Sequence, residues 1–143
     1  MKKSFVISFL LVLGSVLPVF SQEIQQSCTI IETSVKDNLY YNFTLSGDGF
    51  LSYNWGADND NQTTISVDLS KITISKDYSL NSPKVWLNCI NGTSCIEEAG
   101  RMGAREGMYF NYSKTYLPAN NDDDMEAMFM HLNYLIKIAT GKY

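Results

Sequence analysis

The sequence predicts an α+β fold in which a twisted antiparallel sheet is packed by a C-terminal helix and by a second helix near the N-terminus. Two observations carry this prediction. Apolar residues recur at steps of three and four in both terminal segments, which is helical spacing, whereas they alternate in several segments between them. The middle of the chain is also rich in β-branched and aromatic residues, which favour strands.

Residues 1–21 have the pattern of a secretory signal peptide. A pair of lysines precedes an apolar run over residues 5–16, and Pro18 and the small Ser21 follow. This three-part pattern is typical of export signals, and the run is too short to span a bilayer comfortably. We therefore expect a secreted or periplasmic protein whose single domain covers residues 22–143.

The charge balance bears on the partners of that domain. Without residues 1–21, the 11 basic residues fall to 9 against 15 acidic ones, which leaves a net charge of −6. Binding to nucleic acid depends on a basic surface, as does binding to anionic membranes. We therefore expect neither as a partner.

The segment from residue 22 to about residue 43 is expected to be the N-terminal helix. Its apolar residues fall at steps of four and three, at Ile24, Cys28, Ile31, Val35, Leu39 and Phe43. Several β-branched residues within it disfavour a helix, since they lose rotamer freedom there. The Ser-Gly-Asp-Gly run at 46–49 marks the break after it.

The following segments are expected to be strands. Residues 50–55 alternate, and a polar turn over residues 56–62 leads into residues 63–74. There the apolar phase slips by one residue near Ser70, which predicts either a bulge or two short strands that meet at a corner. The chain offers two more strands, residues 85–90 and an aromatic one over residues 108–116.

Cys89 and Cys95 flank an Asn-Gly pair in the stretch CINGTSC. Asn-Gly is a strong hairpin signal, and a three-residue loop over 91–93 would place the two cysteines opposite each other at disulfide distance. Exported proteins usually oxidise such pairs, although two separate buried thiols are the alternative. Cys28 is then either a buried thiol or the true partner of one of these cysteines.

Two loops invite ligand hypotheses. The glycine-rich segment 100–107 carries both arginines of the chain, Arg101 and Arg105, which makes it the loop best suited to bind an anion. A mobile surface loop without a ligand is the alternative. Residues 58–62 alternate oxygen ligands as a calcium loop does, but the Gly and Glu that such a loop requires further on are missing. Since Cys89 and Cys95 together with the single His131 offer at most three zinc ligands, we expect no metal and no cofactor.

The C-terminal helix is the clearest element. Residues 120–124 supply a cap and an acidic first turn, and Gly141 supplies a stop. One continuous apolar stripe runs between them, formed by Met125, Met128, Phe129, Leu132, Leu135, Ile136 and Ala139. His131 lies at the edge of this stripe.

The opposite side of this helix is also apolar, at Met130, Tyr134 and Ile138. Because the solvent side of a helix on a sheet should be polar, these residues are candidates for a partner or dimer interface. The alternative is that the N-terminal segment covers them within the monomer.

Strands closed by a C-terminal amphipathic helix resemble the pleckstrin-homology-like architecture. The chain also resembles small exported bacterial proteins of unknown function whose last helix carries His-Leu-x-x-Leu-Ile, here residues 131–136. The resemblance implies a half-barrel of strands with a helix packed on it, and it implies no activity.

The leading functional hypothesis is an exported, non-enzymatic protein that binds another protein or a cell-envelope component. The alternative is a small-molecule carrier or sensor that uses a cleft between sheet and helix. A hydrolase built around His131, with Cys28 as its nucleophile, is the third reading. No nucleophile signature or carboxylate pair supports it, so we expect no enzyme.

Overall fold

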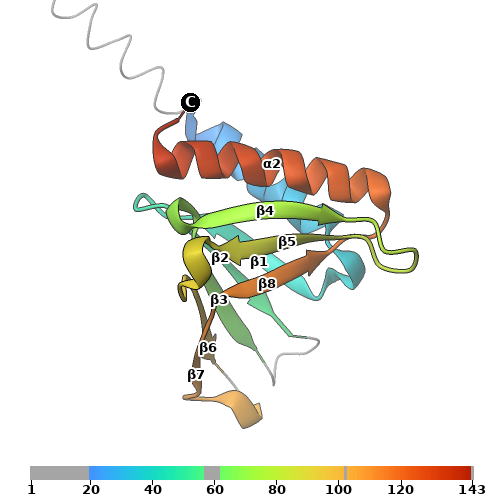
Figure 1. Cartoon of the computed structure of the whole chain (residues 1–143). Coiled ribbons are helices and arrows are strands. Elements are labelled where there is room, and N and C mark those ends of the chain that lie inside the picture. The colour runs from blue at the N-terminus through green and yellow to red at the C-terminus, as the bar shows by residue number, and fades with distance from the viewer. Residues whose placement is uncertain (1–19, 57–61, 102, 143) are drawn as a thin grey trace, which may run out of the picture.

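The computed structural model describes residues 20–56, 62–101 and 103–142. The expected signal peptide lies outside the described residues up to position 19, as does most of the calcium-like run 58–62. The structure confirms the α+β class: antiparallel strands form two sheets, and one helix near each end of the chain packs on them (Figure 1).

The elements have the following bounds. The N-terminal helix covers residues 20–34, and α2 covers Asp122–Thr140. The larger sheet has the order β1-β2-β3-β6-β7, with strands Tyr40–Leu45, Phe50–Trp55, Thr63–Asp68, Ile96–Gly100 and Tyr109–Tyr112. The smaller sheet has the order β4-β5-β8, with strands Ile72–Asp77, Lys84–Cys89 and Lys114–Pro118.

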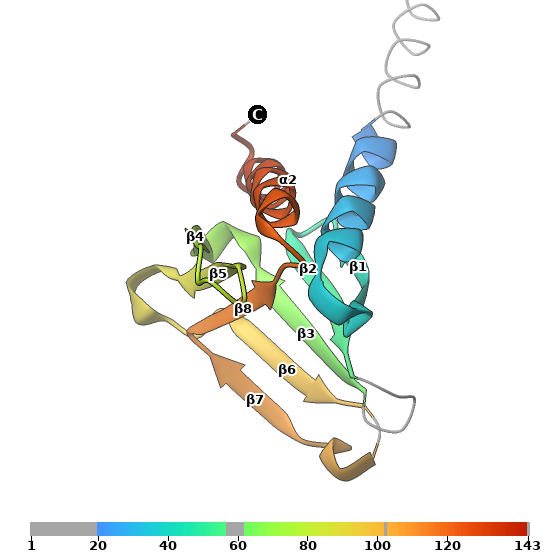
Figure 2. The same cartoon turned by 90° about the vertical axis from the view of Figure 1, so that its right-hand side faces the viewer.

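The two sheets are the two arms of one sharply bent sheet (Figures 1 and 2). β3 continues into β4 through the short helix η2 (Leu69–Lys71), β5 continues into β6, and β7 continues into β8 through Ser113. The matching strand orders β3-β6-β7 and β4-β5-β8 show that three strands turn the same corner. The shift in apolar phase near Ser70 therefore marks the corner and not a bulge. The described strands do not close into a barrel.

Cys89 and Cys95 lie at the middle of this corner. Their sulfur atoms are 2.01 Å apart and their Cα atoms 5.7 Å apart, so the predicted disulfide pair is confirmed. The predicted hairpin is wrong, because β5 pairs with β4 and β8 whereas β6 pairs with β3 and β7. Asn91 and Gly92 do adopt positive φ angles of 58° and 66°, but the turn they form redirects one strand from one arm to the other.

Cys28 is the free cysteine of the described residues, and it is buried. Of the two alternatives for Cys28, the buried thiol is therefore confirmed. Burial raises the pKa of the Cys28 thiol, which keeps it protonated and unreactive near neutral pH.

The N-terminal helix ends earlier than the spacing predicts. It stops at residue 34, and the expected helical residues 40–43 belong to β1 instead. Asp37 leaves the helical region with a φ of 61°, and Phe43 stacks on Tyr53 of β2 at 4.8 Å between ring centroids. The spacing of four residues to Phe43 is thus coincidental, since sheet pairing and aromatic packing decide this segment.

α2 packs across the smaller arm of the sheet, over β4, β5 and η2. The inner face of the helix is completely buried, at Met125, Met128, Leu132 and Leu135. Its ends are capped as expected: the Asn121 side chain accepts a hydrogen bond from the Asp124 amide, and Gly141 ends the helix in the left-handed region. Buried side chains therefore fill the interface between α2 and the sheet.

Candidate functional site

The N-terminal helix and α2 lie side by side in opposite directions on the same side of the sheet (Figure 2). Between them runs a groove of about 370 Å³. We call it the helix groove. It is lined by Glu23, Gln26 and Ser27 from the first helix and by Met130, His131 and Tyr134 from α2. The three- and four-residue steps within each set place its members on the facing sides of the two helices.

The three residues expected to form an interface differ in how exposed they are in the structure. Met130 is 61% exposed at the rim of the groove. Tyr134 is half-buried, and its hydroxyl donates to Glu23 at 2.7 Å. Ile138 is half-buried against the core. The N-terminal helix thus covers part of this side of α2, and it leaves Met130 as the exposed apolar side chain.

The groove shifts the pKa values of two of its residues, Tyr134 and His131. Burial and the hydrogen bond to Glu23 raise the pKa of Tyr134 to about 12, so its hydroxyl stays protonated and donates. Burial lowers the pKa of His131, and its Nδ1 atom lies 3.0 Å from the Ser27 hydroxyl. A neutral imidazole with its proton on Nε2 accepts from that hydroxyl.

The structure does not join His131 to Cys28. Cys28 lines a separate hollow with Phe43 and Leu45, on the side of the N-terminal helix that faces β1. The Cys28–His131 dyad of the third reading is therefore not formed, because the N-terminal helix turns the thiol away from the groove. The residue that contacts His131 is Ser27, which directly precedes Cys28 in the sequence.

The lowered pKa of His131 predicts a pH dependence of stability. Because the folded state disfavours the charged imidazole, its contribution is present above the unfolded pKa of about 6.5 and is lost as the pH falls through the lowered folded pKa. We expect the urea midpoint to fall between about pH 7.5 and about pH 5. This fall should be smaller in a His131→Gln variant, and Ser27→Ala, which keeps the imidazole, should retain it.

The glycine-rich loop folds back over the sheet. A side chain at Gly100 would meet the backbone oxygen of Arg105 at 1.7 Å, so this close approach requires glycine. The Arg105 guanidinium bonds the carboxylate of buried Glu98 at 2.6 Å and lies 5.3 Å from the centre of the Trp55 ring.

Arg101, the other arginine of that loop, donates to the Thr64 hydroxyl at 3.1 Å. Both expected anion-binding residues, Arg101 and Arg105, thus have partners within the chain. Each of these contacts uses one nitrogen of its guanidinium, and the Glu98 carboxylate offsets the positive charge that Arg105 could offer an anion. The structure gives this hypothesis no further support.

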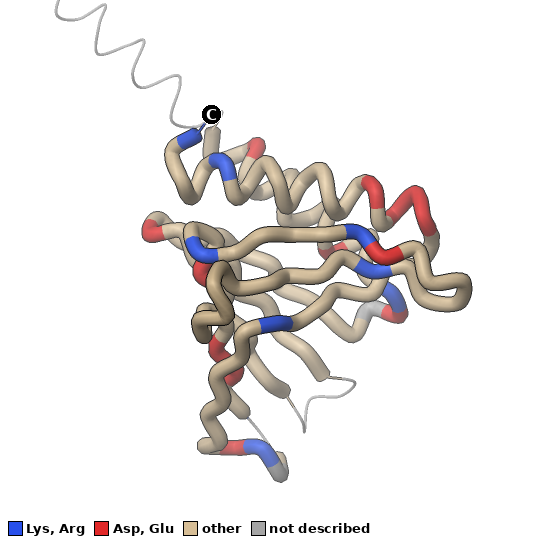
Figure 3. Tube along the Cα trace, viewed as in Figure 1, with Lys and Arg blue, Asp and Glu red and all other residues tan. Residues whose placement is uncertain are grey.

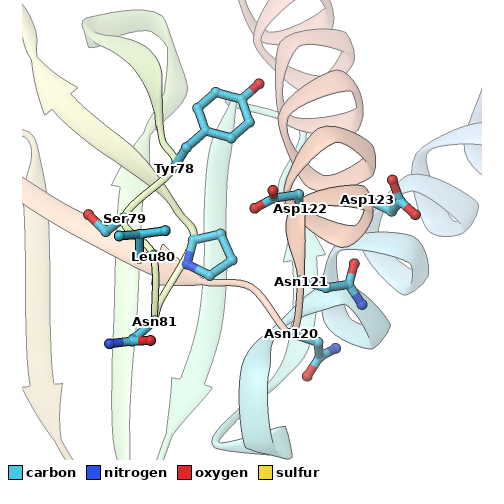
Figure 4. A pocket seen from close by; sticks show the side chains of 9 residues that line it. Tyr78, Ser79, Leu80, Asn81, Asn120, Asn121, Asp122 and Asp123 are labelled. Atoms are coloured by element: carbon cyan, nitrogen blue, oxygen red, sulfur yellow. The ribbon is translucent and has the colours of Figure 1, made fainter.

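A second hollow, of about 500 Å³, lies beside the first turn of α2. Figure 4 shows the loop over residues 78–83 on one side and Asn120 to Asp123 on the other. Asp122 and Asp123 stand on the first turn of the helix, where acidic side chains are stabilised by the helix dipole. This stabilisation of the helix explains why acidic residues stand there, so we assign no ligand to this hollow.

Sequence reasoning missed one surface. Exposed large apolar side chains gather on residues 108–116, at Met108, Tyr109, Phe110, Tyr112 and Tyr116. The aromatic strand expected there is in fact two strands, β7 and β8, and each lies at the edge of its arm. The aromatic composition was a visible signal, but edge position depends on pairing between distant segments.

Within the described ranges, no group of three or more His, Cys, Asp or Glu side chains is placed to hold a metal ion. None of the described helices is long and apolar enough to cross a membrane. No protein-family model, curated protein or solved structure matches this chain.

Proposed function

We propose that this chain is an exported, non-enzymatic protein that binds another protein in the helix groove. The observation that carries the proposal is the exposure of Met130, at 61%, on the rim of a groove whose walls are two helices. Methionine adapts to varied partner surfaces, and tyrosine presents an apolar ring with a polar tip. Met130 beside Tyr134 is therefore a suitable anchor for a partner.

The extent of the surface favours a protein over a small molecule. A neighbouring hollow of about 620 Å³ shares Met130 and Tyr134 with the helix groove and continues along α2 to Lys137. The surface thus runs along more than one turn of the helix. Buried side chains fill the interface between α2 and the sheet, which disfavours a small-molecule carrier that binds there.

The contacts of His131 agree with a binding role. Its Nδ1 atom meets a serine hydroxyl, and in the described part of the chain no carboxylate is hydrogen-bonded to the ring. A Ser–His pair without a group that orients the imidazole lacks the arrangement that activates a serine nucleophile.

Charge substitution at the rim tests the proposal. Native mass spectrometry of the protein purified from its own cell envelope should show a complex, and Met130→Asp should weaken it by about 2 kcal/mol or more, roughly 30-fold. Leu80→Asp is the matched control, because Leu80 is fully exposed on the remote loop 78–83. A Met130→Asp variant that folds and keeps the complex would overturn the proposal.

The same spectra test export. Cleavage after Ser21 gives a chain that begins at Gln22, and an intact Met1 on secreted material would contradict the expected signal peptide.

A further inference from the structure

β7 is an edge strand whose side chains are partly open to solvent. Among the described strands it pairs with β6 alone, and it lies last in the order of the larger arm. All four of its side chains are exposed, and Phe110 and Tyr112 stack with their ring centroids 6.3 Å apart. An apolar edge of this kind is a site where a further strand can add to the sheet.

The register shows which backbone groups are free to pair. The Gly100 amide donates to the Met108 carbonyl at 3.0 Å, and hydrogen-bonded pairs alternate along an antiparallel ladder. Phe110 and Tyr112 therefore bond to β6, opposite Glu98 and Ile96.

The backbone groups of Tyr109 and Asn111 consequently point away from the sheet. The far side of β6 agrees with this pattern, because Cys95 and Arg101 make their backbone bonds to the β3 side, to Asp68 and Gln62. β7 thus presents two outward donors and two outward acceptors at the spacing of a strand.

The other sheet edges carry features that discourage pairing. β1 has a register shift with Asn42 at a φ of 58°, β4 carries Lys76 and Asp77 under α2, and β8 carries Lys114 and Pro118. Bulges, charges and proline are the devices that protect edges. β7 contains none of them, and its trace carries no charge in Figure 3.

We propose that β7 pairs antiparallel with β7 of a second copy of this chain, about a two-fold axis at Phe110. Tyr109 of each copy then exchanges backbone hydrogen bonds with Asn111 of the other. The two Phe110 residues face each other as a non-hydrogen-bonded pair, where Cα atoms are about 4.5 Å apart and side chains are closest. Aromatic pairs at such positions stabilise strand pairing.

A second copy fits this edge because the strand is self-complementary. Its sequence Tyr-Phe-Asn-Tyr has no charge, so identical strands meet without repulsion. The residue paired with Phe110 on β6 is the charged Glu98. Its Oε1 atom lies 2.6 Å from Nη1 of Arg105, which neutralises its charge. The resulting interface is isologous, and it closes after two copies.

Proline at an outward position tests this dimer. Asn111→Pro removes an amide that bonds to no described residue of the monomer, so the domain should keep its circular dichroism spectrum. Sedimentation of the wild-type protein should show a monomer–dimer equilibrium, and Asn111→Pro should raise its dissociation constant at least about tenfold. Asn111→Ala retains the amide and should dimerise like the wild type.

Cross-linking tests the two-fold axis separately. Phe110→Cys should form a disulfide between copies on mild oxidation, whereas Tyr112→Cys, two residues from the axis, should not. Met130→Asp should leave the dimer intact, which separates this inference from the helix groove. A wild-type protein that is monomeric throughout its soluble range, a Phe110→Cys variant that does not cross-link, or binding of only a foreign strand would overturn the proposal.

Discussion

Replacing Leu132 by alanine should lower the free energy of unfolding by about 2–5 kcal/mol, because it opens a cavity among fully buried side chains. Leu132 is 0% exposed on the inner face of α2, next to Met128 and Leu135. The loss should appear as a lower urea midpoint with an unchanged slope.

Met130→Ala is the matched control on the same helix. Since Met130 is largely exposed, its truncation should cost less than about 0.5 kcal/mol. The pair of variants thus separates the side of α2 that holds the fold from the side available to a partner. Equal losses for the two variants would contradict the described packing of the helix.

Removing the Cys89–Cys95 bridge should lower stability by about 2 kcal/mol. The sequence separation of 6 closes a short loop, and the chain-entropy relation gives roughly this value. Double replacement of Cys89 and Cys95 by alanine should produce the loss in thermal or urea unfolding, as should a reducing agent added to the wild-type protein.

The reducing agent should not affect the double variant, which has no bridge to lose. Cys28→Ala in the otherwise native chain should remain sensitive to the reducing agent, because Cys28 is the free cysteine. Equal stability of the oxidised and reduced wild-type protein would show that the corner does not depend on the bridge.

Local patterns predicted the parts of the fold that local energetics decide. The caps at Asn121 and Gly141 and the apolar stripe of α2 are set by neighbours within a few residues, so the sequence located them correctly. The phase slip near Ser70 likewise marked a real corner. Helical spacing failed at residues 40–43, where pairing with β2 outweighs a repeat of four residues.

Local sequence patterns could not predict which strands pair with one another. Asn91 and Gly92 specify a tight turn, but nothing nearby states that the two flanking strands belong to different arms of the sheet. The same limit applies to Arg105, whose partner Glu98 follows from the fold of the loop over Gly100. The position of β7 at the edge likewise depends on how all the strands of the sheet pair, so the local sequence does not reveal it.

The candidate site was located in part. Met130 and Tyr134 were identified because apolar residues are unusual on the side of a surface helix opposite its buried stripe. Their different exposure depends on where the N-terminal helix lies, and that position is fixed by long-range contacts such as Tyr134 with Glu23. The groove itself is therefore a product of tertiary packing.

The most direct test of partner binding in the helix groove is a photo-reactive phenylalanine analogue placed at Met130 in the cells that make the protein. Irradiation should give one discrete covalent adduct, whose mass identifies the partner. The adduct should be absent when the analogue is at Leu80, and it should weaken when Tyr134→Lys is added. No adduct at Met130, or the same adduct from Leu80, would contradict a binding role for the groove.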